Sequence, residues 1–436
     1  MRILVTGLCS LHWGRLEYGN IGNYYMVEPT FRELHRVFPD AEIATTFQMT
    51  EEFCQREKVV CLPLELFYAW SENDLPNALK ELGIATIYQE TGQLVSSTPY
   101  IDEVLKSDLV IDFSGEMWGY HSDLVGRDRF LVGLLKDRVV QLLKKPIVML
   151  AGSPGPFRDE KTRDFAKIVF KDFDFVANRE EESIQILKDA GFYTANVNSY
   201  ACPSFLFEPK SKDEMQEILR NENINSSEKK TVGFVLCGFN FKDGPYDKWP
   251  RLNKEYDEFA DAVEYIINTL DARVVLLSHS NGFDITPEFK LKPGRDYPIV
   301  KQLQQVVLER GNVTADEVLC IDNVYTPKET KAIIGHFDMF ITGRLHASVA
   351  AISQCVPTVI IMHGHGPKSY KIQGFSKLLG IENCVSLPES DDMIDKIKFC
   401  WENRDNIKGH LYERIPLVKN IAKEYFDLLP KYIGDK

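Results

Sequence analysis

The chain of 436 residues is long enough to form two domains of ordinary size, each with its own core. Its hydrophobic share of 44% and charged share of 26% are typical of a globular protein, and no run of about 18 apolar residues predicts a membrane span. The net charge of -13 argues against a sequence-independent nucleic-acid binder, because such proteins normally carry a basic surplus.

The nine cysteines occur singly, and no two of them form a C-x-x-C pair. This spacing disfavours metal and disulfide roles and predicts buried thiols in a reducing compartment. The apolar start of the chain, residues 1–7, is too short for a signal peptide. We therefore expect a cytoplasmic protein with no nucleic-acid partner and at most a peripheral membrane association.

In the first half of the chain, apolar runs that predict buried strands alternate with helical patterns. Strands are expected at residues 3–5, from about 39 to 43, at 109–112 and at 147–150. Helices are expected up to about residue 37 and over residues 130–143, 160–170 and 181–190. Such alternation predicts a parallel sheet that helices cover on both faces.

A polar, apolar-poor segment, residues 209–230, predicts a helix followed by a linker between two domains. Beyond it the alternation restarts, with helices between strands expected at residues 232–236, 273–277, 318–321, 339–341 and 358–361. The domains are therefore expected at residues 1–208 and 231–400. A helical tail, residues 401–436, could pack back on the first domain. The expected fold class is α/β, with two doubly wound Rossmann-like domains.

Polar and glycine-bearing segments follow the predicted strands, where an open α/β sheet presents its ligands. In the first half these segments contain Gly19, Asn20 and Asn23, then Ser114 and Glu116, then Ser153, and finally Arg179. Glycine allows close backbone approach to a ligand, and asparagine amides can donate hydrogen bonds. A surface turn, tight strand-to-helix connections and a local salt bridge of Arg179 remain the alternatives.

The segment 338–348 is the most informative stretch of the second half. It predicts a short buried strand, a turn at Gly343 and a helix whose first residues carry Arg344 and His346. A helix start favours anions, arginine adds a forked permanent charge, and histidine titrates near neutral pH. The pattern predicts a site for a small phosphorylated or carboxylated ligand, with a capping or packing histidine as the alternative.

Three further segments in the second half carry polar side chains. Ser278 and His279 follow a predicted strand but lack the G-x-S-x-G elbow, so we interpret them as a substrate-binding wall. Lys371 begins a helix and is a candidate second cation, with a solvated lysine as the alternative. Residues 363–365, His-Gly-His, have no nearby carboxylate or cysteine at suitable spacing, so no metal site is expected.

Several of these motifs, in order, give the chain a resemblance to a known family. They are residues 19–23, 108–111 before a small-residue turn, 152–156, 178–180 with Ser183, 343–346, and 371–375 ahead of Leu379 and Gly380. With this series, which spans about residues 1 to 385, the chain resembles the polysaccharide pyruvyl transferase family.

The resemblance implies a two-lobed fold similar to GT-B glycosyltransferases and the transfer of pyruvate from phosphoenolpyruvate to two hydroxyls of a sugar, as a cyclic ketal. It implies that Arg179, Arg344 and His346 hold the trianionic donor, a role that suits forked guanidinium groups. His346 could also act as a general acid, and Glu116 and His279 could deprotonate the sugar hydroxyls.

The expected partners are phosphoenolpyruvate as co-substrate and a sugar or lipid-linked oligosaccharide of a polysaccharide precursor as acceptor, with no other cofactor and no metal. Two alternatives stay open. One is a GT-B-like glycosyltransferase that uses a nucleotide sugar, with Arg344 and Lys371 on the diphosphate. The other is a non-catalytic carbohydrate-binding or scaffold protein with the same fold.

Overall fold

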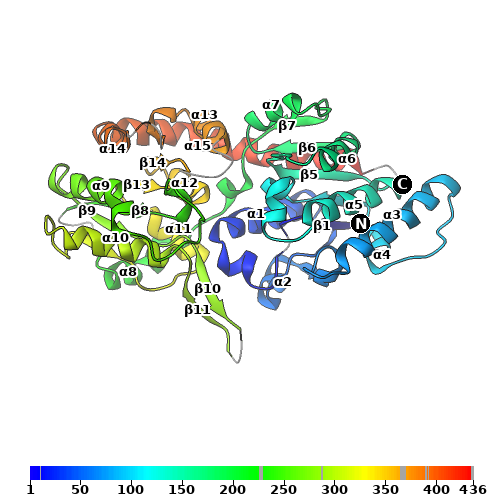
Figure 1. Cartoon of the computed structure of the whole chain (residues 1–436), viewed down its shortest axis with the longest axis horizontal. Helices are drawn as coiled ribbons and strands as arrows, with labels where there is room; N and C mark the ends of the chain where they lie inside the picture. The colour runs from blue at the N-terminus through cyan, green and yellow to red at the C-terminus, as the bar shows by residue number, and fades with distance from the viewer. Residues whose placement is uncertain are drawn as a thin grey trace. The chain divides into compact units, whose positions relative to one another are not determined.

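A computed structural model describes residues 1–9, 11–224, 229–285, 288–363, 370–387, 390 and 392–433. The chain divides into two compact units, in each of which helices flank the strands (Figure 1). The first unit consists of Met1–Glu17, Val27–Pro203 and Asn420–Lys436, and the second of Tyr18–Met26 and Ser204–Lys419. Helices α1 (Ile21–Val37) and α15 (Arg404–Leu428) therefore contribute residues to both units.

The first unit is built on a parallel sheet with the strand order β3-β2-β1-β4-β5-β6-β7. The strands are β1 (Arg2–Thr6), β2 (Glu42–Thr45), β3 (Val59–Cys61), β4 (Leu109–Asp112), β5 (Ile147–Gly152), β6 (Phe175–Asn178) and β7 (Val197–Ser199). Every residue of β4 and β5 is buried, so side chains on both faces of the sheet are covered. Burial on both faces explains why these strands read as continuous apolar runs.

The helices of the first unit pack around an aromatic core on the sheet. They are α2 (Glu51–Glu57), α3 (Asp74–Thr91), α4 (Pro99–Lys106), α5 (Arg129–Leu142), α6 (Glu160–Lys171) and α7 (Glu182–Asp189). Trp118 is fully buried in this core, where its ring lies 5.4 Å from that of Phe130 and its indole Nε1 donates to the Asp137 carboxylate. The indole hydrogen bond satisfies the one polar atom of that side chain.

The end of the chain packs on the first unit. The ring of Tyr425, on α15, lies 5.5 Å from that of Tyr200, and the ring of Tyr432 stacks on Phe175 at 5.3 Å. The predicted return of the C-terminal helix to the first domain is confirmed for its last part, from Asn420, whereas the preceding part of α15 belongs to the second unit.

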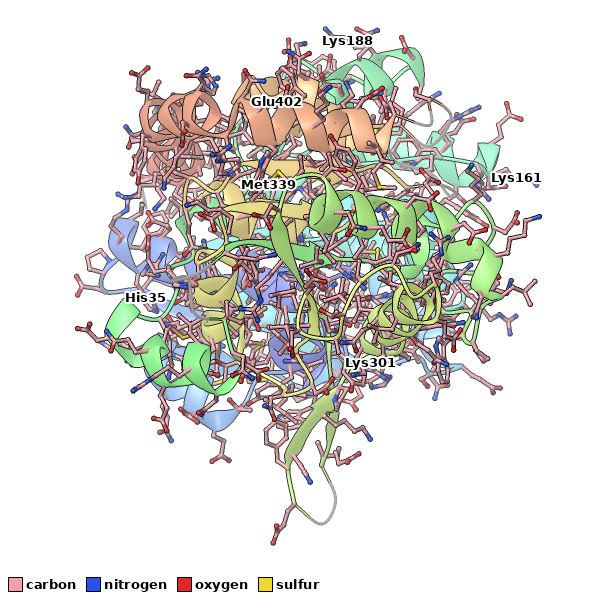
Figure 2. All side chains as sticks on the ribbon, turned by 90° about the vertical axis from the view of Figure 1, so that its left-hand side faces the viewer. His35, Lys161, Lys188, Lys301, Met339 and Glu402 are labelled. Atoms are coloured by element: carbon pink, nitrogen blue, oxygen red, sulfur yellow. The ribbon has the colours of Figure 1, made fainter. Side chains whose placement is uncertain are left out.

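The second unit has a parallel sheet with the strand order β12-β9-β8-β13-β14-β15. The strands are β8 (Lys230–Val235), β9 (Ala272–Leu276), β12 (Val318–Cys320), β13 (Met339–Thr342), β14 (Thr358–Ile361) and β15 (Val385–Ser386). The helices are α8 (Lys212–Asn221), α9 (Asp257–Asn268), α10 (Tyr297–Glu309), α11 (Pro327–Ile334), α12 (Leu345–Ile352), α13 (Tyr370–Leu379) and α14 (Met393–Glu402). Met339 of β13 lies fully buried within this unit (Figure 2).

An antiparallel hairpin interrupts the alternation of the second unit. Strand β10 (Asn281–Asp284) pairs with β11 (Lys290–Pro293), and the hairpin projects from the body of the unit (Figures 1 and 2). Strand β11 is mostly exposed and β10 mostly half-buried, and neither shows the regular apolar alternation that the sequence pattern relies on. For this reason the sequence pattern did not predict them.

The prediction of two doubly wound α/β sheets is confirmed. The strands that it missed include the short outer strands β3, β7 and β15, which have two or three residues each and too little apolar pattern to stand out. Helix α8, predicted inside residues 209–230, begins with a capping box formed by Ser211 and Glu214. The predicted linker after it includes residues 225–228, which lie outside the described residues.

Membrane-spanning helices were sought in the described ranges of the chain. Within them, no helix combines the length and the apolar character that crossing a membrane requires.

Candidate functional site

Each sheet reverses its strand order at one point, and the loops that follow the strands there are the first place to look for a site. In the first unit the reversal falls between β1 and β4, and in the second between β8 and β13. Open parallel sheets bind ligands beyond the carboxyl ends of the strands at this switch point.

At the switch point of the second unit, Asn240 holds the ends of three strands together. Its Oδ1 accepts a hydrogen bond from the Cys237 backbone N–H at 3.0 Å, and its Nδ2 donates to the Ile361 carbonyl. A side chain at Gly343 would collide with the Asn240 amide. Gly343 therefore makes room for a structural asparagine, which the sequence pattern did not single out.

Arg344 is fixed by a carboxylate from a distant part of the chain. Its Nε and Nη2 each donate to an oxygen of Asp296 at 2.5 Å, and its backbone N–H donates to Thr342 Oγ1 at 3.0 Å. Asp296 is 1% exposed, and the Arg344 side chain is 13% exposed. Burial opposes the charge, but the Asp296 carboxylate outweighs burial and raises the pKa of Arg344. The guanidinium is therefore permanently charged and rigidly oriented.

His346 lies against the first turn of α1, where the glycine–asparagine motif of residues 19–23 leads into the helix. A Cβ added to Gly22 would lie 2.5 Å from His346 Nδ1, so only glycine allows this approach. In the same motif, Gly19, Asn20 and Asn23 are half-buried, and the Asn23 N–H donates to the Asn20 carbonyl at 2.9 Å. The structure thus brings together two motifs that are more than 300 residues apart.

His279 and Ser278 follow β9. Ser278 Oγ donates to the Ser280 carbonyl at 2.7 Å, which fixes the turn. His279 is 1% exposed, its ring lies 5.4 Å from that of Tyr25, and its Nε2 has no hydrogen-bond partner among the described residues. Burial and the charge of Arg344 lower the pKa of His279 to about 3, so the imidazole is neutral and a poor proton acceptor.

Lys371 lies in the first turn of α13 and is half-buried. Burial lowers the pKa of Lys371 to about 8, so a fraction of its population is neutral at physiological pH. The preceding residues 364–369, which include His365 of the His-Gly-His segment, lie outside the described residues.

A further arginine, which the sequence interpretation missed, stands beside Arg344. Arg295 is exposed and lies over the ring of Tyr246, with its Cζ 5.2 Å from the ring centroid. Tyr246 stacks on Phe239 at 4.8 Å, and Phe239 stacks on His363 at 5.0 Å. Although the residue as a whole is exposed, partial burial of its guanidinium end and the charge of Arg344 lower the pKa of Arg295. The only sequence signal was its position directly before Asp296.

In the first unit, Arg179 is enclosed by polar groups of neighbouring loops. Its Nε and Nη2 donate to Ser153 Oγ at 3.2 and 3.0 Å, and Ser153 Oγ donates to Glu180 at 2.9 Å. Ser183 also hydrogen-bonds to Glu180. Arg179 is 6% exposed; burial opposes its charge, but Cys202 and Glu180 outweigh burial and raise the pKa of Arg179.

Ser114 is fully buried and ties the loops of the first switch point together. Its Oγ donates to Asp112 at 2.6 Å and accepts from the Leu8 N–H at 2.8 Å. Burial raises the pKa of Asp112 to about 7. Glu116, two residues further on, is half-buried in a short 3-10 turn, Gly115–Met117.

The predicted site residues therefore fall into two groups, each described within its own unit. Ser114, Glu116, Ser153 and Arg179 belong to the first unit. Gly19, Asn20, Asn23, Ser278, His279, Gly343, Arg344, His346 and Lys371 belong to the second unit.

Comparison with known proteins gives a family and a fold. Residues 20–365 match the family model described as polysaccharide pyruvyl transferase. A relative, the amylovoran biosynthesis protein AmsJ of Erwinia amylovora, is 24% identical over 341 residues, which are 77% of this chain and 75% of that protein.

Solved structures with the same fold include sugar-nucleotide enzymes. A glycosyltransferase from Rickettsia africae aligns with a TM-score of 0.60 and 8% identity, over 100% of this chain and 99% of its own. The UDP-GlcNAc 2-epimerase of Neisseria meningitidis, bound to UDP-GlcNAc, aligns with a TM-score of 0.58 and 11% identity, over 99% of this chain and 100% of its own. These similarities confirm the GT-B-like fold and, at such identities, show the fold alone.

Proposed function

The chain belongs to the polysaccharide pyruvyl transferase family, and from this premise we propose that it moves a pyruvyl group from phosphoenolpyruvate to two hydroxyls of a sugar in a polysaccharide precursor. One hydroxyl oxygen adds to C2 of the enol while C3 takes up a proton and becomes a methyl group. The C2–O bond to phosphate then breaks, and the second hydroxyl oxygen bonds to C2. The products are a cyclic ketal and inorganic phosphate. The two protons that the hydroxyls lose balance the one that C3 gains and the one that leaves on phosphate.

One observation carries the proposal: Arg344 and His346 stand at the switch point of the second unit with the Gly22 backbone against the imidazole. All three residues lie in motifs of the family pattern. A permanently charged guanidinium suits the carboxylate or phosphate of the donor, and an imidazole can supply a proton at neutral pH. We assign Arg344 to donor binding and His346 to protonation of C3.

The other roles follow from the environment of each residue. For Arg179 of the first unit we keep, as a prediction, the anion-binding role that the family resemblance implies; within that unit its guanidinium donates two hydrogen bonds to the Ser153 hydroxyl. His279 is too weak a base to deprotonate a hydroxyl, so we assign it to the packing beneath Arg344. The reaction uses phosphoenolpyruvate as co-substrate and needs no other cofactor.

The acceptor is proposed from the relative with 24% identity, whose name assigns it to the biosynthesis of amylovoran. We propose a sugar of an exopolysaccharide precursor, free or lipid-linked.

Thermal unfolding with separate ligands tests the donor. Phosphoenolpyruvate at millimolar concentration should raise the melting temperature of the wild-type protein, and Arg344→Ala should abolish the rise. Arg220→Ala is a matched control, because Arg220 is exposed on α8 and, among the described residues, donates to the Gln216 carbonyl of its own helix. A rise with UDP-sugars and none with phosphoenolpyruvate would select the glycosyltransferase alternative.

A further inference from the structure

The charge of Arg344 is already matched inside the protein. Its Nε–Nη2 edge, which forms the usual fork for a carboxylate or phosphate, is occupied by both oxygens of Asp296. Arg344 and Asp296 together therefore carry no net charge, and the N–H groups left for a ligand are the two of Nη1 and the second one of Nη2. A trianionic donor needs a second cation, because the Arg344–Asp296 pair as a whole supplies no net positive charge.

Arg295 has the properties of such a cation. It is adjacent in sequence to Asp296, it is exposed, and its contact within the described part of the chain is with the ring of Tyr246. It forms no ion pair with a described residue. A ring contact leaves the N–H donors of a guanidinium available for a bidentate partner.

Contacts with two other residues, Arg251 and Gly238, fix the position of Tyr246 under Arg295. Arg251 is 4% exposed, and its guanidinium donates to the carbonyls of Asp243 and Pro245 at 3.0 Å, which fixes the loop before Tyr246. The backbone of Tyr246 lies directly on Gly238, where a side chain would collide with the Tyr246 carbonyl. Tyr246 is thus held from two sides.

Arg295 and Arg344 share one electrostatic environment. The charge of Arg344 acts on Arg295, and both guanidinium groups interact with Cys237 and Tyr246. Two arginines and one aspartate leave an excess of one positive charge at the carboxyl ends of β8 and β13. Because like charges repel, this arrangement is stabilised when an anion is bound.

We propose that Arg295 binds the phosphate of the donor through its guanidinium fork. Arg344, oriented by Asp296, contacts the donor through its remaining N–H groups, and Tyr246 positions Arg295. This inference rests on the proposed function and adds to it a binding residue outside the family motifs. It also explains why an exposed arginine is placed over an aromatic ring whose own loop is fixed by a buried arginine.

Titration calorimetry with phosphoenolpyruvate tests the inference. Arg295→Ala should weaken binding about 10- to 100-fold, the range expected for a lost charge-assisted fork. Arg295→Lys should recover only part of the affinity, because an ammonium is a point charge without a fork. The control Arg220→Ala should leave the affinity unchanged.

The positioning role has its own variants. Tyr246→Phe keeps the ring and should bind like the wild type, whereas Tyr246→Leu removes the ring and should weaken binding several-fold. An Arg295→Ala protein that binds phosphoenolpyruvate within twofold of the wild type would overturn the inference and leave the proposed function standing. A wild-type protein that binds no phosphoenolpyruvate would instead overturn the proposed function, and the inference with it.

Discussion

The two switch points have the same topology, but the loops that meet there carry different side chains. In the first unit, the loops after β1 and β4 bind each other: Leu8 and Cys9 donate to Ser114, and a side chain at Gly7 would lie 2.8 Å from the Phe113 backbone. In the second unit, the loops after β8 and β13 meet through Asn240 and carry charged side chains above the strand ends.

The charge of the two regions differs accordingly. In the first unit, Arg179, which follows β6, is accompanied by the carboxylate of Glu180, and both bond the hydroxyl of Ser153, which follows β5. In the second, Arg344 and Arg295 are accompanied by Asp296, and one positive charge remains. The comparison shows that topology decides where loops meet. The residues of the loops decide whether their polar groups pair with each other or remain available to bind a ligand.

Removing the carboxylate that orients Arg344 should have the largest effect on the stability of the second unit. Asp296→Ala leaves a nearly buried guanidinium unpaired and should lower the free energy of unfolding by about 3 to 5 kcal/mol, measured by urea denaturation. The control Asp322→Ala removes the more exposed partner of Lys301 in the same unit and should cost less than about 1 kcal/mol. Equal losses of unfolding free energy in the two variants would show that the Asp296–Arg344 pair stabilises the fold no more than an exposed ion pair does.

Filling the space beside His346 should damage activity more than stability. Gly22→Ala places a methyl group 2.5 Å from the imidazole and should lower kcat at least about tenfold, with a loss of about 1 to 3 kcal/mol in unfolding free energy. Gly409→Ala is the control, because nothing lies within 4 Å of its Cβ and alanine favours the helix. Phosphate release from phosphoenolpyruvate measures the effect, and an unchanged kcat in Gly22→Ala would contradict the role of His346.

The first region should show the reverse pattern. Ser114→Ala removes the acceptor of the buried Leu8 N–H and a donor to Asp112, and should lower the unfolding free energy by about 2 kcal/mol. Affinity for phosphoenolpyruvate in titration calorimetry should stay at the wild-type value. A large loss of affinity at wild-type stability would place Ser114 in ligand binding.

The pH dependence of stability should reveal His279. Its pKa is about 3 in the folded protein and about 6.5 when unfolded, so the unfolded chain binds more protons between these values. Stability should therefore fall as pH drops from 6.5 toward 3, by about 1.5 kcal/mol between pH 6.5 and pH 5. The variant His279→Asn should lack this component in urea titrations at the two pH values. An equal pH slope in both proteins would refute a buried, neutral His279.

The central strands were predictable because they are short apolar runs followed by small or polar residues. Strands β1, β4 and β13 all fall where the pattern placed them, within one or two residues. Helix α3 was missed because its sequence contains Pro76 and Gly83 and a weak apolar periodicity. The hairpin β10–β11 was missed because its short strands, with the sequences NGFD and KLKP, show no regular apolar alternation.

The candidate site was predictable only in part. Gly343, Arg344 and His346 stand out because a glycine, a cation and a titratable group coincide at a helix start. Asp296 and Arg295 gave no comparable signal, since they lie before a different helix and more than 45 residues away in sequence. Their relation to Arg344 exists only through tertiary contact.

The sequence by itself determined the α/β alternation, the positions of the turns that end the central strands and the residue types that can bind an anion. These are local properties, set by apolar periodicity and by the chemistry of single side chains. Only the tertiary structure decided which charges are already paired. Asp296 neutralises Arg344, and Tyr246 holds Arg295 without neutralising it, because hydrogen bonds and ring contacts form between groups that folding brings together from separate loops.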